Sequence, residues 1–366
     1  MMKPLYVSAT KQDTGKTTHV IGLFQAFRDL GYDVGYMKPV GQRYVRYEGR
    51  NVDEDAVLAR LAFGLKDPPG DMSSIAIERG FTANYIFHRD PKPLENRIME
   101  SFNRLRAAHD LMVIEGTGHA GVGSCFDLSN ARVAQMFGGA VIIITEGGIG
   151  RAIDEIALSL HLFREHGVTV LGAILNKTLP DKFDKVRAAV AQGLENLGTR
   201  LLGVVPYRPE LLYPRMEQVA SEVRGEVLCC DEALPNVIEN IVVAAMAPEH
   251  VRPYLRDRTL VITPGDRIDR PLVAVLTGTT AGDTLPPVRG VVLTGGFEPA
   301  AEILEALRAA GIPVVLSKDD TYTVAALLKT MRFKIRVQDT DKIEAAKRLV
   351  RESIDIEAMA RQLKGP

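Results

Sequence analysis

The residues best suited to phosphate chemistry lie between the first apolar run of the chain and its first amphipathic stretch. Gly15, Lys16 and Thr17 stand at the start of a predicted helix, within the segment SATKQDTGKTT at 8–18. Backbone N–H groups at a helix N-terminus bind anionic oxygens, a lysine in this position reaches the β- and γ-phosphates, and a threonine hydroxyl ligates Mg²⁺. This arrangement predicts a nucleotide-binding loop, with a chance Gly-Lys-Thr at a helix start as the alternative. The residues predicted to hold the nucleotide are Thr10, Lys11, Asp13, Thr14, Gly15, Lys16, Thr17 and Thr18.

Further polar residues stand where predicted strands end. Lys38 follows the second apolar run, Glu115 ends the third and Asn176 ends a later one. Ligands of parallel sheets collect at the carboxyl ends of the strands, so we expect these side chains near the loop. A glutamate after four apolar residues needs a buried partner. The alternative for Lys38 is a solvated lysine, and the alternative for Asn176 is a simple turn residue.

The order of the apolar runs predicts an α/β fold with a parallel sheet. Short β-rich runs alternate with amphipathic helical ones through about residue 210, and continuous apolar strands separated by helices indicate a sheet covered on both faces. The pattern changes near 207–235, and a second β/α series follows. The first series comprises runs 4–9, 33–40, 110–116, 139–146, 168–177 and 200–207, with a helix at 17–30. The second comprises runs 241–246, 259–267, 271–278, 289–296 and 312–320, a helix between the last two, and a charged helical pattern from Thr340.

Composition narrows the class of protein. The chain has 366 residues, which favours two domains, and a formal net charge of −1. That balance gives no electrostatic reason to expect a nucleic acid or a membrane surface as partner. Three cysteines make neither a disulfide framework nor a metal quartet, and no signal sequence or membrane span is evident. We therefore expect a cytoplasmic protein.

The loop resembles the G-T-D-T-x-x-G-K-T loop of dethiobiotin synthetases, in which threonine also stands at the position of Thr10. Ala9 replaces the leading glycine of that family, and Lys11 replaces its aspartate. Lys11 also occupies the place of the signature lysine of the related MinD-like ATPases, which contacts nucleotide across a dimer. The resemblance thus implies ATP as cofactor and a homodimer, and an exposed loop lysine is the alternative for Lys11.

Two further motifs extend this resemblance. GYMKPVG at 35–41 resembles the strand of the family that ends in Lys-Pro-Val, which implies that Lys38 is catalytic together with Lys16 and lies by the transferred phosphate and the substrate carboxylate. NVDEDAVLAR resembles the acidic segment that supplies a magnesium ligand, which implies Asp55, with Asp53 in reserve. An acidic helix start that stabilises the helix dipole without any metal is the alternative.

LMVIEGTGHAG at 111–121 resembles the V-E-G-A-G-G motif of the family. It implies that Glu115 completes the magnesium shell, because Mg²⁺ favours oxygen ligands. Gly116 permits close approach of phosphate or substrate, and His119, which departs from the glycine of the family, contacts substrate or is an exposed loop residue. The implied magnesium ligands are Thr17, Asp55 and Glu115.

The base-binding segments of the family have counterparts near the end of the first series. ILNK at 174–177 matches the strand end whose asparagine reads adenine, which implies that role for Asn176. The segment 203–214 resembles the G-V-I-P segment, which implies that Pro206 and Tyr207 line the pocket for the base.

The resemblance fails at the substrate. The serine that follows Lys-Pro-Val in dethiobiotin synthetases is missing, so ATP and magnesium are implied but the biotin-pathway substrate is not. Arg43, Arg46 and Arg50 follow instead, and these either bind a small anionic metabolite or form a solvated basic loop.

The second half resembles the DRTGG domain, a regulatory module found beside CBS domains and inside long phosphotransacetylases, over about 217–335. The residues that carry the resemblance are Asp266, Arg267, Thr294, Gly295, Gly296, Asp320, Thr321 and Thr323. The combination resembles the N-terminal region of long phosphotransacetylases, and an acetyl-transferring domain is not expected in these residues. The predicted architecture is a dethiobiotin synthetase-like P-loop NTPase domain at 1–215, a smaller α/β DRTGG domain at 216–338 and a helical tail at 339–366.

Two functions are compatible with these observations. The first is a slow ATPase or nucleotide-dependent regulator coupled to the DRTGG domain. The second is an ATP-dependent ligase that phosphorylates a small carboxylate or carbamate. The regulatory domain and the missing serine favour the first function, and Lys38 favours the second.

Overall fold

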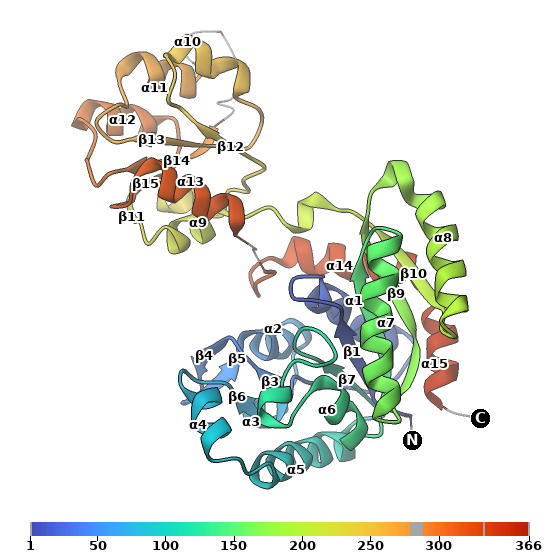
Figure 1. The fold of residues 1–366 in the computed structure, drawn as a ribbon. Helices are drawn as coiled ribbons and strands as arrows, with labels where there is room; N and C mark the ends of the chain where they lie inside the picture. The colour runs from blue at the N-terminus through green and yellow to red at the C-terminus, as the bar shows by residue number, and fades with distance from the viewer. Residues whose placement is uncertain (1, 279–287, 332–333, 365–366) are drawn as a thin grey trace. The chain divides into compact units, whose positions relative to one another are not determined.

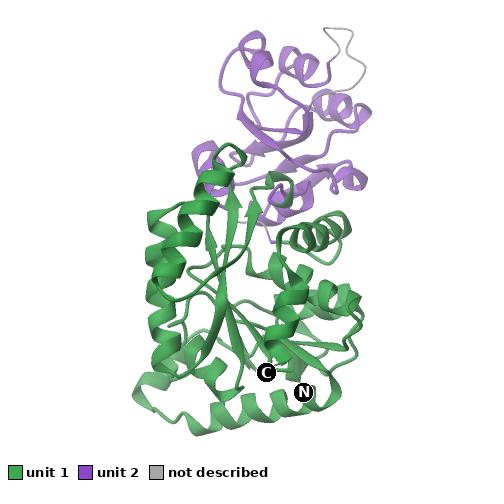
Figure 2. Ribbon diagram, turned by 90° about the vertical axis from the view of Figure 1, so that its right-hand side faces the viewer, with its two compact units in different colours: residues 1–211, 335–366 green, residues 212–334 purple. Residues whose placement is uncertain are grey.

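The computed structural model describes residues 2–278, 288–331 and 334–364. The chain forms two compact units, one made of Met1–Leu211 with Ile335–Pro366 and the other of Leu212–Lys334 (Figure 2). The segment from residue 335 onward, which contains most of the predicted tail, therefore belongs to the first unit; residues 365 and 366 lie outside those described.

The first unit is built on a six-stranded sheet with the order β10-β9-β8-β1-β7-β2 (Figure 1). All of its strand pairs are parallel, so the predicted parallel α/β sheet is confirmed. The central strands are buried on both faces, as their continuous apolar sequences require. The strands are β1 (Leu5–Ala9), β2 (Val34–Met37), β7 (Leu111–Glu115), β8 (Ala140–Glu146), β9 (Thr169–Thr178) and β10 (Leu201–Pro206).

Helices and two short sheets complete this unit. The helices are α1 (Lys16–Asp29), α2 (Glu54–Phe63), α3 (Pro69–Met72), α4 (Phe81–Phe87), α5 (Lys92–Ala108), α6 (Asn130–Met136), α7 (Gly150–Glu165), α8 (Phe183–Asn196), α14 (Thr340–Ser353) and α15 (Ile356–Lys364), with single turns η1 (Ser124–Phe126), η2 (Pro180–Lys182) and η3 (Pro209–Leu211). The short sheets pair β3 (Val40–Gly41) with β6 (Ile75–Ala76), and β4 (Tyr44–Tyr47) with β5 (Arg50–Asp53). No described helix is long and apolar enough to cross a bilayer.

The second unit contains a five-stranded sheet with the order β11-β15-β14-β13-β12, in which only β11 among the described strands is antiparallel to its neighbour. Its strands are β11 (Glu226–Cys229), β12 (Asn240–Val243), β13 (Thr259–Pro264), β14 (Val288–Thr294) and β15 (Val314–Leu316). Its helices are α9 (Met216–Glu222), α10 (Pro248–Val251), α11 (Arg270–Leu276), α12 (Ala301–Ala309) and α13 (Thr321–Thr330), with turns η4 (Asp231–Ala233) and η5 (Arg252–Tyr254).

One apolar run of the second series is not a strand. We expected the run at 271–278 to be a strand, but its first six residues belong to the helix α11. Asp269 caps this helix by accepting a hydrogen bond from the backbone N–H of Leu272, and a proline opens its first turn. A short apolar run does not distinguish a strand from a buried helix, and the capping residues decide here.

The last long helix of the chain packs against the helix that begins at the phosphate loop. α14 contacts α1 around Gly22, where a Cβ added to the glycine would lie 2.3 Å from Cβ of Val350 and 3.0 Å from the carbonyl oxygen of Ala346. A glycine is therefore needed for the close approach of the two helices, although glycine lowers helix propensity.

We expect Gly22→Ala to lower the free energy of unfolding of the first unit by about 1–3 kcal/mol, because the added methyl overpacks the α1–α14 contact. Urea denaturation followed by circular dichroism measures this change. Gly150→Ala, at the open start of α7, is the matched control and should change stability by less than about 0.5 kcal/mol. Equal stability of both variants would contradict the packing role of Gly22.

Candidate nucleotide-binding site

The loop between β1 and α1 is anchored to the neighbouring β8 and α7 by its first residue. The backbone N–H of Thr10 donates to the carbonyl of Ile144 at 2.9 Å. The Thr10 hydroxyl donates to Oε2 of Glu155 at 2.8 Å and lies 3.1 Å from the hydroxyl of Thr145. Glycine at this position would lack these side-chain bonds. Threonine in place of the usual glycine thus fixes the start of the loop.

The other end of the loop requires glycine. Gly15 has a φ of +94°, and a Cβ built on it would lie 2.4 Å from the amide nitrogen of Asn176. This amide donates to the carbonyl of Thr14 at 2.7 Å. Asn176 therefore lies against the loop, as expected for a strand-end residue, and its recognition of an adenine base stays a prediction.

Lys16 is half-buried beside the loop, and its ammonium makes a long hydrogen bond to the loop backbone. Its Nζ donates to the carbonyl of Lys11 over a long distance of 3.4 Å, and the hydroxyl of buried Thr14 donates to the same carbonyl at 3.4 Å. Burial lowers the pKa of Lys16 to about 8, although the carboxylate of Glu115 opposes this shift. A phosphate group in the loop would stabilise the charged form, so Lys16 fits its predicted role.

Lys11 and Lys177 share one carboxylate. Nζ of Lys11 forms an ion pair with Glu146, and Nζ of Lys177 lies 2.8 Å from the other oxygen of Glu146. Lys177 also donates to the carbonyl of Asp13 at 2.7 Å, and Asp13 lies in the left-handed region with φ 58°. Lys11 is thus paired within its own chain, and contact with nucleotide across a dimer stays a prediction.

Glu115 is held by two hydroxyl groups. Its Oε1 accepts from the hydroxyl of Thr17 at 2.8 Å, and its Oε2 accepts from the phenol of Tyr36 at 3.0 Å. Burial, and secondarily the charge of Glu115, raise the pKa of Tyr36, so the phenol remains a donor. The sequence did not predict a role for Tyr36, because its contact with Glu115 depends on the register of β2 with β7, in which Tyr36 lies opposite Val113.

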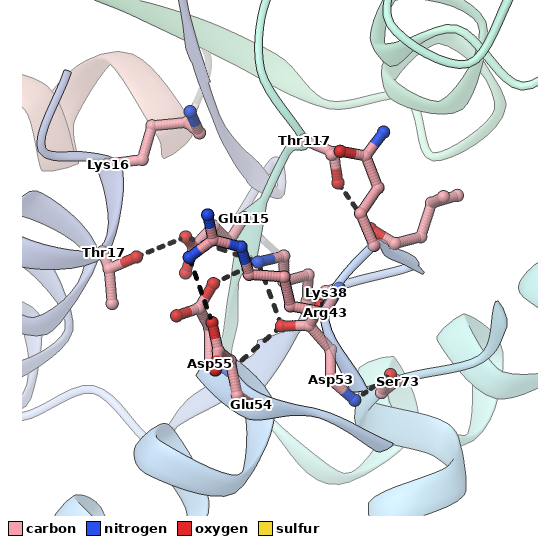
Figure 3. Close-up of polar contacts among 12 residues, drawn as sticks. Lys16, Thr17, Lys38, Arg43, Asp53, Glu54, Asp55, Ser73, Glu115 and Thr117 are labelled. Carbon is pink, nitrogen blue, oxygen red and sulfur yellow. Dashed lines mark hydrogen bonds and ion pairs between the residues drawn. The ribbon is translucent and has the colours of Figure 1, made fainter. Parts of the chain in front are cut away.

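The ammonium of Lys38 lies among buried carboxylates (Figure 3). Its Nζ is 3.0 Å from Oδ1 of Asp53, in direct contact with Oδ2 of Asp55 and 4.0 Å from Oε1 of Glu115. Burial favours the neutral amine, but Asp55, Glu115 and Asp53 outweigh it and raise the pKa of Lys38. Burial raises the pKa of Asp53, and Lys38 opposes that shift. Asp53 also accepts from the backbone N–H of Asp55 at 3.0 Å and so caps α2.

The predicted magnesium ligands have the chemistry that the ion prefers. The hydroxyl of Thr17 and the carboxylates of Asp55 and Glu115 supply the hard oxygens that Mg²⁺ prefers, and Thr17 and Glu115 are already in contact. Among residues 2–278, 288–331 and 334–364, however, no group of three or more His, Cys, Asp or Glu side chains has the arrangement of a metal site. The ammonium of Lys38 lies where the two carboxylates come together.

The loop after β7 is organised by a buried asparagine. Oδ1 of Asn130 accepts from the phenol of Tyr6 at 2.7 Å and from the backbone N–H of Thr117 at 3.1 Å. Its amide donates to the carbonyls of Thr117 and His119. A Cβ on Gly116 would lie 2.7 Å from the Tyr6 ring and 2.8 Å from Oδ1 of Asn130, so packing within the chain is enough to require this glycine. Approach of a substrate to Gly116 stays a prediction.

The remaining predicted residues lie at the surface or at strand ends. The His119 side chain is exposed, and its Nδ1 accepts from the backbone N–H of Gly121 at 3.2 Å. Pro206 ends β10, and the backbone N–H of Tyr207 donates to the carbonyl of Thr178 at 2.8 Å. Thr18 is half-buried in the first turn of α1. The contact of these residues with a substrate or nucleotide stays a prediction.

The arginine cluster is distributed along the hairpin of β4 and β5. Arg43 is 3.9 Å from Glu54, and its side chain is 58% exposed. Arg46 lies in β4 and Arg50 in β5, both exposed. The structure therefore agrees with a solvated basic hairpin and leaves anion binding as a prediction.

The motif residues of the second unit make local contacts at strand ends. The hydroxyls of Thr294 and Thr321 are 2.7 Å apart, and Asp320 caps α13 by accepting from the backbone N–H groups of Tyr322 and Thr323. The backbone N–H groups of Gly295 and Gly296 donate to carbonyls of the loop after β15. Asp266 and Arg267 lie on the loop after β13. Turn and cap formation thus accounts for much of this motif.

We expect Tyr36→Phe to lower the free energy of unfolding by about 1–3 kcal/mol, because it removes a phenol donor from a buried carboxylate. Urea denaturation followed by circular dichroism tests this expectation. Tyr44→Phe is the matched control, since Tyr44 is 39% exposed on β4, and its effect should stay below about 0.5 kcal/mol. If Tyr36→Phe proves as stable as Tyr44→Phe, the phenol does not hold Glu115.

Comparison with known proteins agrees with this arrangement. A family model described as an AAA domain matches residues 3–215, and one described as a DRTGG domain matches residues 218–331. The chain is 27% identical to the phosphate acetyltransferase of Nitratidesulfovibrio vulgaris over 99% of its own length and 52% of that protein. It is 27% identical to the phosphate acetyltransferase of Pseudomonas putida over 94% of its own length and 49% of that protein. The chain thus spans about half the length of these curated relatives.

Two solved structures are similar to parts of the chain. MinD complexed with Mg-ADP from Pyrococcus horikoshii is 16% identical, with 58% of this chain and 84% of that chain covered and a TM-score of 0.38. The CBS and DRTGG domains of Clostridium perfringens pyrophosphatase are 19% identical, with 37% and 60% covered and a TM-score of 0.26. The predicted combination of a P-loop domain with a DRTGG domain is confirmed by the two family models. The chain belongs to the AAA domain family and joins this domain to a DRTGG domain, as in the N-terminal region of phosphate acetyltransferases.

Proposed function

We propose that the first unit binds Mg-ATP and works as a nucleotide-dependent regulator or slow ATPase coupled to the DRTGG domain. The observation that carries this proposal is the position of Lys16, Thr17 and Glu115. Lys16 and Thr17 directly follow Gly15 at the end of the loop, and Thr17 contacts Glu115. Burial lowers the pKa of Lys16, and Thr17 already touches a carboxylate. Both features suit a bound polyphosphate with its metal.

The chain's own residues have defined roles in this proposal. Backbone N–H groups of the loop and the N-terminus of α1 bind phosphate oxygens. Lys16 and Lys38 neutralise the charge that develops on the phosphate, and positioning with electrostatics supplies most of the rate in such reactions. Thr17, Asp55 and Glu115 would hold Mg²⁺, which supplies further neutralisation of phosphate charge when bound.

Coupling to the DRTGG domain is supported by the path of the chain. After the second unit the chain returns to the first as α14, which packs on α1. α1 begins at the phosphate loop, directly after Gly15. A change at the N-terminus of α1 on nucleotide binding therefore acts on a helix joined covalently to the DRTGG domain. We propose a cytoplasmic homodimer as the working form, following the family resemblance.

The proposal is tested by titrating fluorescent ATP and ADP analogues in the presence of Mg²⁺. Lys16→Ala should weaken affinity at least about tenfold, because a charge-assisted hydrogen bond contributes about 1.5–3 kcal/mol. Lys185→Ala, an exposed lysine on α8, is the control and should bind as the wild type does. Unchanged affinity of Lys16→Ala would remove the nucleotide site from this loop.

An ATP-dependent ligase is the second candidate, and the burial of Lys38 among carboxylates favours it, since a solvated strand-end lysine would need no such environment. Incubation with Mg-ATP, bicarbonate and a panel of amines and carboxylates separates the two functions. A regulator should hydrolyse ATP slowly and independently of the panel. Turnover that strictly requires one small molecule would instead establish the ligase.

A further inference from the structure

The acidic residues around Lys38 contain more negative charge than a buried site holds without a cation. Asp53, Asp55 and Glu115 are all buried, and the Nζ atom of Lys38 is within 4.0 Å of each of them. Unpaired buried carboxylates cost several kcal/mol each. The ammonium of Lys38 therefore has the role that a metal cation has in other acidic sites.

The ammonium contacts the oxygens that a metal would take. It touches Oδ2 of Asp55 and lies 4.0 Å from Oε1 of Glu115. The same Oε1 accepts a hydrogen bond from the hydroxyl of Thr17. A divalent cation bound by Thr17, Asp55 and Glu115 would need these oxygens. Two cations at such short separation repel strongly in a site of low dielectric constant. The ammonium and the divalent cation thus exclude each other at Asp55.

Two contacts besides the one with Asp55 hold Lys38 in place. Its backbone N–H donates to the carbonyl of Met72 at 2.7 Å, which fixes the main chain just after β2. Asp53 holds the ammonium from a second direction at 3.0 Å and is itself fixed by a hydrogen bond from its backbone N–H to the hydroxyl of Ser73 at 3.0 Å. Lys38 therefore has a backbone contact and a carboxylate partner that do not depend on Asp55; its ion pairs with Asp53 and Asp55 are drawn in Figure 3.

We propose that Lys38 is a tethered counter-ion that occupies the place of the divalent cation in the nucleotide-free protein and must leave Asp55 before that cation binds. An anionic group that accepts the displaced ammonium, such as a polyphosphate, then favours uptake of the divalent cation. This inference rests on the proposed magnesium ligands, but its first consequence concerns the protein without any nucleotide.

Binding of Mn²⁺ to the nucleotide-free protein tests the exchange, measured by electron paramagnetic resonance of the free ion. The wild type should bind Mn²⁺ weakly. Lys38→Met should bind one Mn²⁺ per chain at least about tenfold more tightly, because removing the ammonium leaves the carboxylates to the metal. Mg²⁺ should also raise the thermal unfolding midpoint of Lys38→Met, whereas NaCl of equal ionic strength should not.

Lys177→Met is the matched control, because Lys177 is also a strand-end lysine paired with a carboxylate but lies at Glu146. Its Mn²⁺ affinity should equal that of the wild type. If Lys38→Met does not fold, Lys38→Met combined with Asp53→Asn lowers the uncompensated charge and is tested in the same way. No gain in Mn²⁺ affinity in a folded Lys38 variant overturns the proposal, as does tight Mn²⁺ binding by the nucleotide-free wild type. Failure of ATP to bind would overturn the proposed function. The Mn²⁺ titration would still test the exchange, because it contains no nucleotide.

Discussion

The first unit depends on pairing one buried lysine with three buried carboxylates. Lys38, Asp53, Asp55 and Glu115 meet at the carboxyl edge of a parallel sheet whose central strands are largely apolar. Charges in such surroundings are tolerated only when paired and hydrogen-bonded. The neighbouring elements satisfy this condition with the hydroxyls of Thr17 and Tyr36, with the cap of α2 and with the backbone contact of Lys38.

Thr10 stands in the phosphate loop where the common pattern has glycine, and neighbouring elements of the fold bind its side chain. Thr10 uses its hydroxyl to join the loop to Glu155, while the opposite end of the loop retains the glycine that its left-handed backbone and its contact with Asn176 require. The loop is therefore fixed at both ends by side chains from β9 and α7. This preorganisation suits a site that binds a polyanion through backbone N–H groups, since those groups must already point inward.

The path of the chain adds a route for communication. A domain inserted before the last helices of its host is connected to that host twice, and here the returning segment packs on α1 through Gly22. Close packing of two helices transmits small displacements because interiors are dense and resist compression. The proposed coupling to the DRTGG domain would thus follow a path that begins at the phosphate loop, within the first unit.

Local signals in the sequence were enough to predict the parallel α/β class, the phosphate loop and the strand-end positions of Lys38, Glu115 and Asn176, because apolar periodicity and glycine placement act over short stretches of chain. The DRTGG domain was predicted from a resemblance to a known family, and the family model matches it. The strand predicted at 271–278 was wrong, because the capping residues there favour a helix. The folded chain was needed to show that Tyr36 holds Glu115, that Asn130 organises the next loop and that Lys38 lies between Asp53 and Asp55. These contacts join segments far apart in the chain, and their partners are selected by sheet register and by the need to pair buried charge.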